Sequence, residues 1–431
     1  MAFLVAGTLQ VASQMADAQE SLERKGKYSV RGLRVALTLS SPEVSASTVA
    51  VLDGVFRALG FESCRRREAS VQGFPGELAG FLEQLHAHRG PVGCALVAAV
   101  APRGQLRRPR QLVRELSCCG ALRGCPKVFL LLSSTPGAAP EPGAFLSGLR
   151  ELCGRSPHWP LLQLLTEVFC RTAEETSGTT YCPVLRSSLR GALCLGDVGP
   201  WGPEPAPGPS AQYDLSGARA ALLLAVIQGR PGARHDVEAL GGLCEALGFE
   251  TTLRTDPTAQ AFLEELAQFR DRLDTHRGPV SCALVALMAH GGPQGQLLAV
   301  DGQAVWPEAL VQELSGCRAL RGCPKIFLLQ ACRGGGICSG PTPGSCDQAD
   351  ILTVYATAEG CVAYRDEKGS DFIQTLVEVL RAEPQGDLLE LLTEANRQVC
   401  ELDVLGPDSD ERRKACLEIR SSLRRRLCLQ A

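Results

Sequence analysis

A cysteine and a histidine, each followed by glycines, are the residues of this chain best suited to nucleophilic chemistry. Cys332 stands in "QACRGGG" just after the apolar run "KIFLLQ", and His290 stands in "AHGG" just after the apolar run "VSCALVALM". A thiolate attacks carbonyl carbons, and an imidazole exchanges protons near neutral pH. Glycines let backbone amides approach a substrate closely. The pair therefore indicates acyl transfer through a cysteine nucleophile.

The two residues can act together only if the strands before them end at the same edge of a sheet. In the second half of the chain, apolar runs typical of buried strands alternate with helical patterns, and a helix with Asp256 as N-cap is predicted after the second run. This alternation predicts an α/β fold with a parallel sheet covered by helices on both faces. Right-handed connections bring the carboxyl ends of the strands to one edge, so we expect Cys332 and His290 to face one crevice. The predicted strands are 221–227, 249–254, 280–288 and 325–330, with a polar hairpin at 295–305 and a helix from Pro307.

The chain also repeats itself. "KYSVRGLRVALTL" from Lys27 returns as "QYDLSGARAALLL" from Gln212, and "LRSSLRGALCL" from Leu185 returns as "IRSSLRRRLCL" from Ile419. Between these pairs, "ALRGCPKVFLLLSST" returns as "ALRGCPKIFLLQACR" in the same order, which predicts a duplicated domain. A segment rich in proline and glycine separates the copies and reads as an extended linker. The predicted boundaries are an N-terminal extension at 1–26, a first copy at 27–195, a linker at 196–212 and a second copy at 213–431.

The motif residues of the second copy resemble the caspase family. "QACRG" is similar to the caspase signature, and His290 precedes Cys332 by 42 residues (332 minus 290), as the partner histidine of that family would. The resemblance extends over 213–431 and includes "YATAEGCVAYRDEKGSDFIQTL"; "DPTAQAFLEEL", "LMAHG" and "LLELLTEANR" are most similar to the epidermal, caspase-14-like branch. It implies a mostly parallel six-stranded sheet with helices on both faces, duplicated here with a degenerate first copy. It also implies a large-subunit-like part at 213–337, a linker at 338–350 and a small-subunit-like part at 351–431.

Caspases are cysteine endopeptidases that cleave after aspartate. The resemblance implies that Cys332 attacks the scissile carbonyl and that His290 protonates the leaving amine. The backbone N–H groups of Gly291 and Cys332 would hold the oxyanion, each worth about 3 to 4 kcal/mol.

The resemblance also supplies a substrate pocket and processing sites. The family's aspartate pocket carries over onto Arg230, Gln330 and Arg365, and guanidinium groups suit a buried carboxylate. Arg234 lies close enough in sequence to be confused with Arg230. A cut between the two parts would follow Asp347 or Asp350, the only acidic residues between Arg333 and Ile351. The family needs no cofactor and no metal.

Two other interpretations of these residues are open. Cys332 could be one more apolar cysteine, although Gln330 and Arg333 are unusual neighbours for a core position. A metal site built from Cys332, Cys338, Cys346 and His290 would have spacings that match no standard zinc pattern.

The first copy lacks the chemistry of the second. When the two copies are aligned, Ser134 stands at the position of Cys332, Leu132 at that of Gln330 and Pro102 at that of His290. The first copy also lacks the strand that would carry a counterpart of Arg365. A serine without a histidine is not an activated nucleophile. The first copy therefore resembles a pseudocaspase kept for packing or partner contact. An alternative for the whole chain is a catalytically silent, caspase-like regulator or decoy that acts by protein–protein binding.

Composition limits the partners. A net charge of −3 gives no reason to expect nucleic acid, and no apolar run reaches the roughly 20 residues that span a bilayer. The 20 cysteines include no CxxC pair, which favours a reducing, cytoplasmic location. We expect protein substrates with aspartate before the scissile bond. We also expect either a caspase-type dimer or an internal pseudodimer formed through the final segments of both copies.

Overall fold

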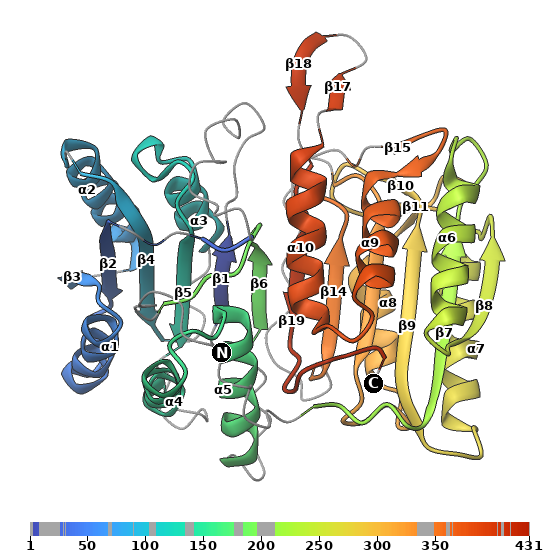
Figure 1. The fold of residues 1–431 in the computed structure, drawn as a ribbon, viewed down its shortest axis with the longest axis horizontal. Helices are drawn as coiled ribbons and strands as arrows, with labels where there is room; N and C mark the ends of the chain where they lie inside the picture. Colours follow the sequence, from blue (N-terminus) through green and yellow to red (C-terminus); the bar gives the residue numbers. More distant parts are fainter. Residues whose placement is uncertain are drawn as a thin grey trace. The chain divides into compact units, whose positions relative to one another are not determined.

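The chain forms two compact units, Met1–Ala211 and Gln212–Ala431. The division falls at the end of segment 196–212, which the sequence predicts as a linker. The structure is a computed structural model, drawn in Figure 1. It describes residues 3–7, 26–28, 30, 32–67, 71–88, 90–102, 109–133, 142–175, 184–195, 212–333, 349–358, 363, 365–402, 404–406, 409–413 and 415–430.

The second unit is built on a sheet in the order β8-β7-β9-β13-β14-β19. The first five strands run parallel, and β19 is antiparallel to β14, so the mostly parallel six-stranded sheet is confirmed for this unit. The strands are β7 Ala218–Ala225, β8 Glu250–Thr255, β9 Val280–Met288, β13 Lys325–Gln330, β14 Ile351–Tyr355 and β19 Glu418–Ser421.

Helices cover both faces of this sheet because successive side chains of each strand point to opposite faces. Leu223 and Leu284 pack with the helices of one face, and Leu224 and Val285 pack with those of the other. The first face carries α6 Ala233–Ala246, α9 Asp371–Ala382 and α10 Leu388–Glu401; the second carries α7 Ala259–Asp274 and α8 Pro307–Ser315 (Figure 1).

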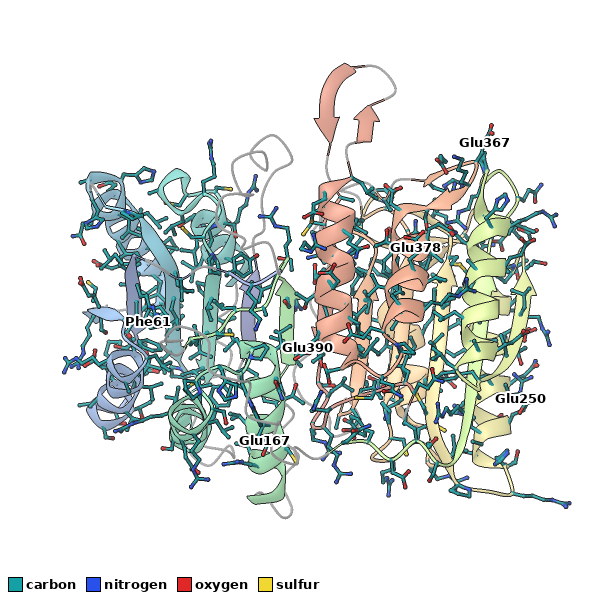
Figure 2. All side chains as sticks on the ribbon, viewed as in Figure 1. Phe61, Glu167, Glu250, Glu367, Glu378 and Glu390 are labelled. Atoms are coloured by element: carbon teal, nitrogen blue, oxygen red, sulfur yellow. The ribbon has the colours of Figure 1, made fainter. Side chains whose placement is uncertain are left out.

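Short hairpins lie at the end of the sheet toward which the parallel strands point (Figure 1). Two labelled residues mark the ends of the unit in Figure 2: Glu250 begins β8 at one end, and Glu367 lies in the β15–β16 turn at the other. The strands of the short hairpins are β10 His290–Gly291, β11 Leu297–Leu298, β12 Ala304–Val305, β15 Arg365–Asp366, β16 Gly369–Ser370, β17 Val404–Gly406 and β18 Ser409–Arg413.

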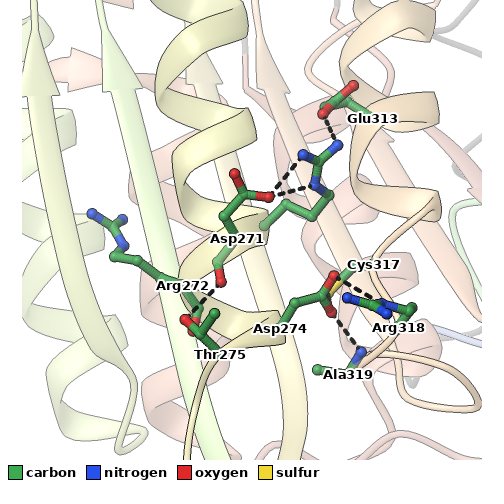
Figure 3. A network of polar contacts seen from close by, with 9 residues as sticks. Asp271, Arg272, Asp274, Thr275, Glu313, Cys317, Arg318 and Ala319 are labelled. Atoms are coloured by element: carbon green, nitrogen blue, oxygen red, sulfur yellow. Dashed lines mark hydrogen bonds and ion pairs between the residues drawn. The ribbon is translucent and has the colours of Figure 1, made fainter.

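A polar network fixes the chain that enters β13. The Asp274 carboxylate, at the end of α7, accepts hydrogen bonds from the Ala319 N–H at 2.8 Å and the Cys317 thiol at 3.2 Å (Figure 3). Arg270 of α7 forms an ion pair with Glu313 of α8. The segment before β13 is thereby tied to both helices that cover one face.

The sequence predicts Asp256 as the N-cap of α7, and the structure shows that this is wrong. The helix begins at Ala259, and the Thr258 side chain caps it by accepting from the Ala261 N–H. Asp256 instead has a positive φ of 51°, and its carboxylate accepts from the N–H groups of Ile227 and Gln228 at 2.8 and 2.9 Å. This carboxylate therefore holds two backbone N–H groups of the loop after β7. The same loop leads directly to Arg230.

The first unit has a sheet of the same size, in the order β3-β2-β4-β5-β1-β6. Its strands are β1 Phe3–Gly7, β2 Leu33–Ser40, β3 Glu62–Arg67, β4 Val92–Ala101, β5 Lys127–Ser133 and β6 Val184–Ser188. One face packs against α1 Ala46–Ala58, α4 Pro142–Arg155 and α5 Leu161–Glu175, and the other against α2 Phe74–Ala87 and α3 Pro109–Ser117.

The strand β1 corrects the predicted boundary at residue 26. Phe3–Gly7 pairs antiparallel with β5 and parallel with β6, so this part of the predicted extension belongs to the first sheet. In the second unit, the position between β13 and β19 is held by β14. Because the first copy lacks the corresponding segment, β5 and β6 would otherwise present unpaired backbone groups, and the N-terminal strand satisfies them.

Candidate active site

Cys332 and His290 come from adjacent strands. β9 and β13 pair in parallel with Gln330 opposite Met288, so the residues that follow them leave the sheet side by side. The backbone of Gly291 lies directly on that of Cys332: a Cβ on Gly291 would stand 1.8 Å from the Cys332 carbonyl oxygen. Only glycine permits this approach. The structure therefore brings the histidine segment against the cysteine, as the sequence predicts.

Both side chains are accessible. Cys332 is half-buried, with its sulfur 3.8 Å from the Ala363 carbonyl oxygen, and His290 is exposed. The pKa of His290 is lowered from its usual value, first by partial burial and then by the positive charges of Arg230 and Arg365. A backbone hydrogen bond at Gly229 acts in the opposite direction. The imidazole is thus favoured in its neutral form, which can accept a proton from a thiol.

Two arginines and a glutamine gather beside the cysteine. Arg230 is 3% exposed and donates from Nη1 to the Val226 carbonyl oxygen at 2.7 Å. Arg365 on β15 donates from Nε to the Pro231 carbonyl oxygen at 2.7 Å. Burial lowers the pKa of Arg230 to about 10, and the charge of Arg365 adds to this effect. Arg234 lies exposed on α6, which separates it from Arg230.

Polar atoms of this cluster lack partners. The Nε atom of Arg230 and the side-chain oxygen of Gln330 are buried without a hydrogen bond, and Gln330 is 2% exposed at the end of β13. Buried polar atoms are nearly always paired, so two unpaired polar atoms in one cluster indicate that a bound ligand or substrate group supplies their partners. Two guanidiniums in one place suit a carboxylate.

Sequence reasoning missed Asp236. It is 1% exposed on α6, and its Oδ1 atom accepts from the Ser370 N–H at 2.8 Å and from the Gln374 amide at 2.9 Å. Its charge raises the pKa of both Arg230 and Arg365, against the effect of burial. Asp236 therefore ties α6 to the hairpin that carries Arg365. In the sequence alone, an acidic residue in a first helical turn is typical of a helix-dipole partner and does not indicate a functional role.

Arg333 belongs to a different cluster. It is buried, its Nη1 donates to Glu418 at 2.7 Å, and its guanidinium lies 4.1 Å from the centre of the Tyr355 ring. Arg420 stacks on the same ring at 4.5 Å and donates to the other oxygen of Glu418 at 2.7 Å. The residue after Cys332 is thereby fastened to β14 and β19.

Asp350 is an interior residue. It is 1% exposed, and its carboxylate accepts from the Tyr213 hydroxyl at 2.6 Å and from Nε and Nη2 of Arg424 at 2.9 and 2.5 Å. Its backbone N–H donates to Ser422, and its carbonyl accepts from Lys325. A protease could reach the bond after Asp350 only if this arrangement opened. Asp347 lies outside the described residues.

The metal interpretation involves residues that lie outside the described part of the chain. Cys338 and Cys346 lie outside the described residues, and within the described ranges no group of three or more His, Cys, Asp or Glu side chains could hold a metal ion. Within the same ranges, no helix has the length and apolar character needed to span a bilayer.

The first unit has no matching cluster at the described positions. Leu132 is 1% exposed near the end of β5, and Pro102 follows β4. Ser134 lies outside the described residues.

The family model of the caspase domain matches residues 218–428. Human Caspase-14 is 44% identical over 236 residues, covering 51% of this chain and 96% of that protein. Mouse Caspase-14 is 40% identical over 255 residues, covering 53% and 98%, and rat Caspase-8 is 32% identical over 210 residues, covering 42% of each. The solved structure of Caspase-1 from Spodoptera frugiperda is 26% identical with a TM-score of 0.46, covering 52% of this chain and 98% of that one. Because the two Caspase-14 proteins are at least 40% identical to this chain and are covered almost completely, the chain belongs to the caspase family, whose domain is a cysteine protease domain.

Proposed function

We propose that the chain is a cysteine endopeptidase that cleaves peptide bonds after aspartate. The observation that carries this proposal is the group of Arg230, Gln330 and Arg365 beside Cys332, with buried polar atoms still unpaired. A substrate carboxylate would satisfy the Arg230 Nε donor and offset the repulsion between the two guanidiniums. An uncharged side chain such as asparagine could accept a hydrogen bond from Arg230 Nε but would leave the repulsion between the two guanidiniums in place, which gives selectivity for aspartate.

The proposed reaction proceeds in two steps. Neutral His290 takes the thiol proton of Cys332, and the sulfur attacks the carbonyl carbon to form a tetrahedral oxyanion. The N–H groups of Gly291 and Cys332 hold the oxyanion. The C–N bond then breaks, the amine leaves with the proton from His290, and water hydrolyses the thioester.

We further propose that the first unit is a degenerate copy without activity. The first four strands and the last strand follow the same order in the two sheets, which supports a common origin, and buried Leu132 in place of Gln330 supports the loss of a pocket. We propose Asp347 as the site of any cut between the two parts of the second unit, because Asp350 is buried and fully engaged.

Hydrolysis of matched peptides tests the proposal. The full chain is assayed on a peptide with aspartate before the scissile bond and on its asparagine counterpart. We expect cleavage of the first only, abolished by Cys332→Ala and unchanged by Ser134→Ala. Cleavage that survives Cys332→Ala, or equal cleavage of both peptides, would overturn it. A folded chain that cleaves neither peptide would favour the silent regulator.

A further inference from the structure

A buried arginine of the first unit lacks a partner that its counterpart in the second unit has. Arg190 stands in "RSSLRG" where Arg424 stands in "RSSLRR". Both backbone N–H groups donate to a tyrosine hydroxyl, Arg190 to Tyr28 at 3.1 Å and Arg424 to Tyr213 at 3.0 Å. The two arginines therefore hold equivalent places in their units.

The guanidinium groups differ in what they bind. Arg424 donates from Nε and Nη2 to the two oxygens of Asp350. In Arg190, which is 5% exposed, the same two atoms, Nε and Nη2, are buried without a hydrogen bond. Within the described part of the chain, no ion pair involves Arg190. Nε and one Nη form the edge of a guanidinium that matches a carboxylate with two parallel hydrogen bonds.

The strand that pairs with the buried lysine differs between the two units. In the second unit, Lys325 pairs with Ile351 of β14, and Asp350 directly precedes that strand. In the first unit, Lys127 pairs with Gly7 of β1. The five residues of β1, "FLVAG", carry no charged side chain. The replacement strand thus restores backbone pairing without restoring the anion.

A second buried cation lies near Arg190. Lys127 is 3% exposed, and its ammonium donates to the carbonyl oxygens of Leu122 at 2.6 Å and Cys125 at 3.2 Å. Burial lowers the pKa of Lys127 to about 8, and the charge of Arg190 acts in the same direction. In the second unit, the charge of Asp350 raises the pKa of the corresponding Lys325 against the effect of burial. The first unit retains two cations from a cluster that an aspartate neutralises in the second.

We propose that Arg190, together with Lys127, forms an anion-binding site in the first unit that takes a planar carboxylate through Nε and Nη2 of Arg190. An unpaired buried charge is costly, so an anion that supplies two acceptors stabilises the unit that binds it. A tetrahedral oxoanion shares the charge but matches the flat edge of the guanidinium less well. The site is separate from the proposed peptidase centre and does not depend on its activity.

Anion titration of the full chain tests this proposal. Acetate and inorganic phosphate are added at constant ionic strength, with chloride as the reference, and the Nε–H resonance of Arg190 is followed by NMR. We expect acetate to move this resonance with saturation in the millimolar range and to raise the thermal unfolding midpoint of the first unit by a few degrees. Stronger binding of phosphate would assign the site to tetrahedral oxoanions and refute the carboxylate preference.

Two variants provide the controls. Arg190→Gln should abolish the saturable rise in midpoint, while Arg155→Gln, at an exposed arginine of the same unit, should keep it. An unmoved Arg190 resonance, or an acetate effect that persists in Arg190→Gln, would overturn the proposal. If Arg190→Gln fails to fold, the NMR titration of the unmodified chain decides alone.

Discussion

At the scale of single residues, Asp236 connects the substrate pocket to the fold. Its buried carboxylate accepts hydrogen bonds from the Ser370 N–H, at the end of the hairpin that carries Arg365, and from the Gln374 amide of α9. Loss of this anchor should let Arg365 move relative to Arg230 and should leave Cys332 in place. The effect should therefore appear in KM for aspartyl peptides more than in kcat.

We predict that Asp236→Ala raises KM for an aspartyl peptide about tenfold, the equivalent of about 1.4 kcal/mol. Asp236→Asn keeps an acceptor oxygen and should recover most of the loss. Asp271→Ala, at an exposed residue of α7, should leave KM unchanged. Steady-state kinetics measure all three variants. An unchanged KM in Asp236→Ala would refute the positioning role, and an equal loss in Asp236→Asn would show that charge matters more than position.

The surroundings of His290 predict the pH at which its imidazole binds a proton. Burial and two guanidiniums disfavour the charged imidazole, so His290 should bind its proton at a lower pH than free histidine, below the usual pKa of 6.5. The neutral base should then persist as the pH falls through 6.5. NMR titration of the imidazole protons, assigned with His290→Gln, gives the midpoint. A midpoint above 6.5 would contradict this electrostatic description of the site.

At the scale of elements, β1 is the least expected part of the fold. It pairs with β5 and β6 from a segment that the sequence places outside both copies.

Deleting residues 1–10 should leave the backbone of β5 unpaired along one edge. We predict that hydrogen exchange of the amides of β5 speeds up strongly in the deletion variant. The amides of β13, the corresponding strand of the second unit, serve as the internal control and should not change. Equal protection of β5 with and without residues 1–10 would show that β1 is not needed for this sheet.

Particular elements show what the sequence could and could not reveal. The strands β9 and β13 have the bounds that the sequence predicts, because a continuous apolar run is typical of a strand buried on both faces. The meeting of Cys332 with the histidine segment followed from the parallel order. The role of Asp236 and the strand β1 could not be predicted in this way, because each depends on a partner that lies far away in the sequence. A buried carboxylate in a helix and an apolar N-terminal segment look ordinary until the chain is folded.

At the scale of the whole molecule, the two copies are joined by a short tether. A linker of about 17 residues in an extended proline-rich form reaches roughly 50 Å at about 3.1 Å per residue. Such a tether raises the effective concentration of an internal partner to about the millimolar range. We therefore propose that the first copy pairs with the second inside one chain, in place of a second chain.

This proposal predicts that the full chain stays monomeric where residues 213–431 alone form dimers. Light scattering over a dilution series of both proteins measures the difference. If the full chain dimerises as readily as the isolated second unit, internal pairing is wrong.

Covalent labelling of the cysteines tests whether Cys332 is the nucleophile of a site that selects aspartate. The full chain is treated with a peptide chloromethyl ketone that ends in aspartate, and in parallel with the uncharged asparagine reagent, and the modified cysteines are identified by mass spectrometry. We expect one thioether, on Cys332, formed much faster with the aspartyl reagent. Equal labelling of Cys332 by both reagents, or labelling of exposed Cys118 in preference to Cys332, would contradict it.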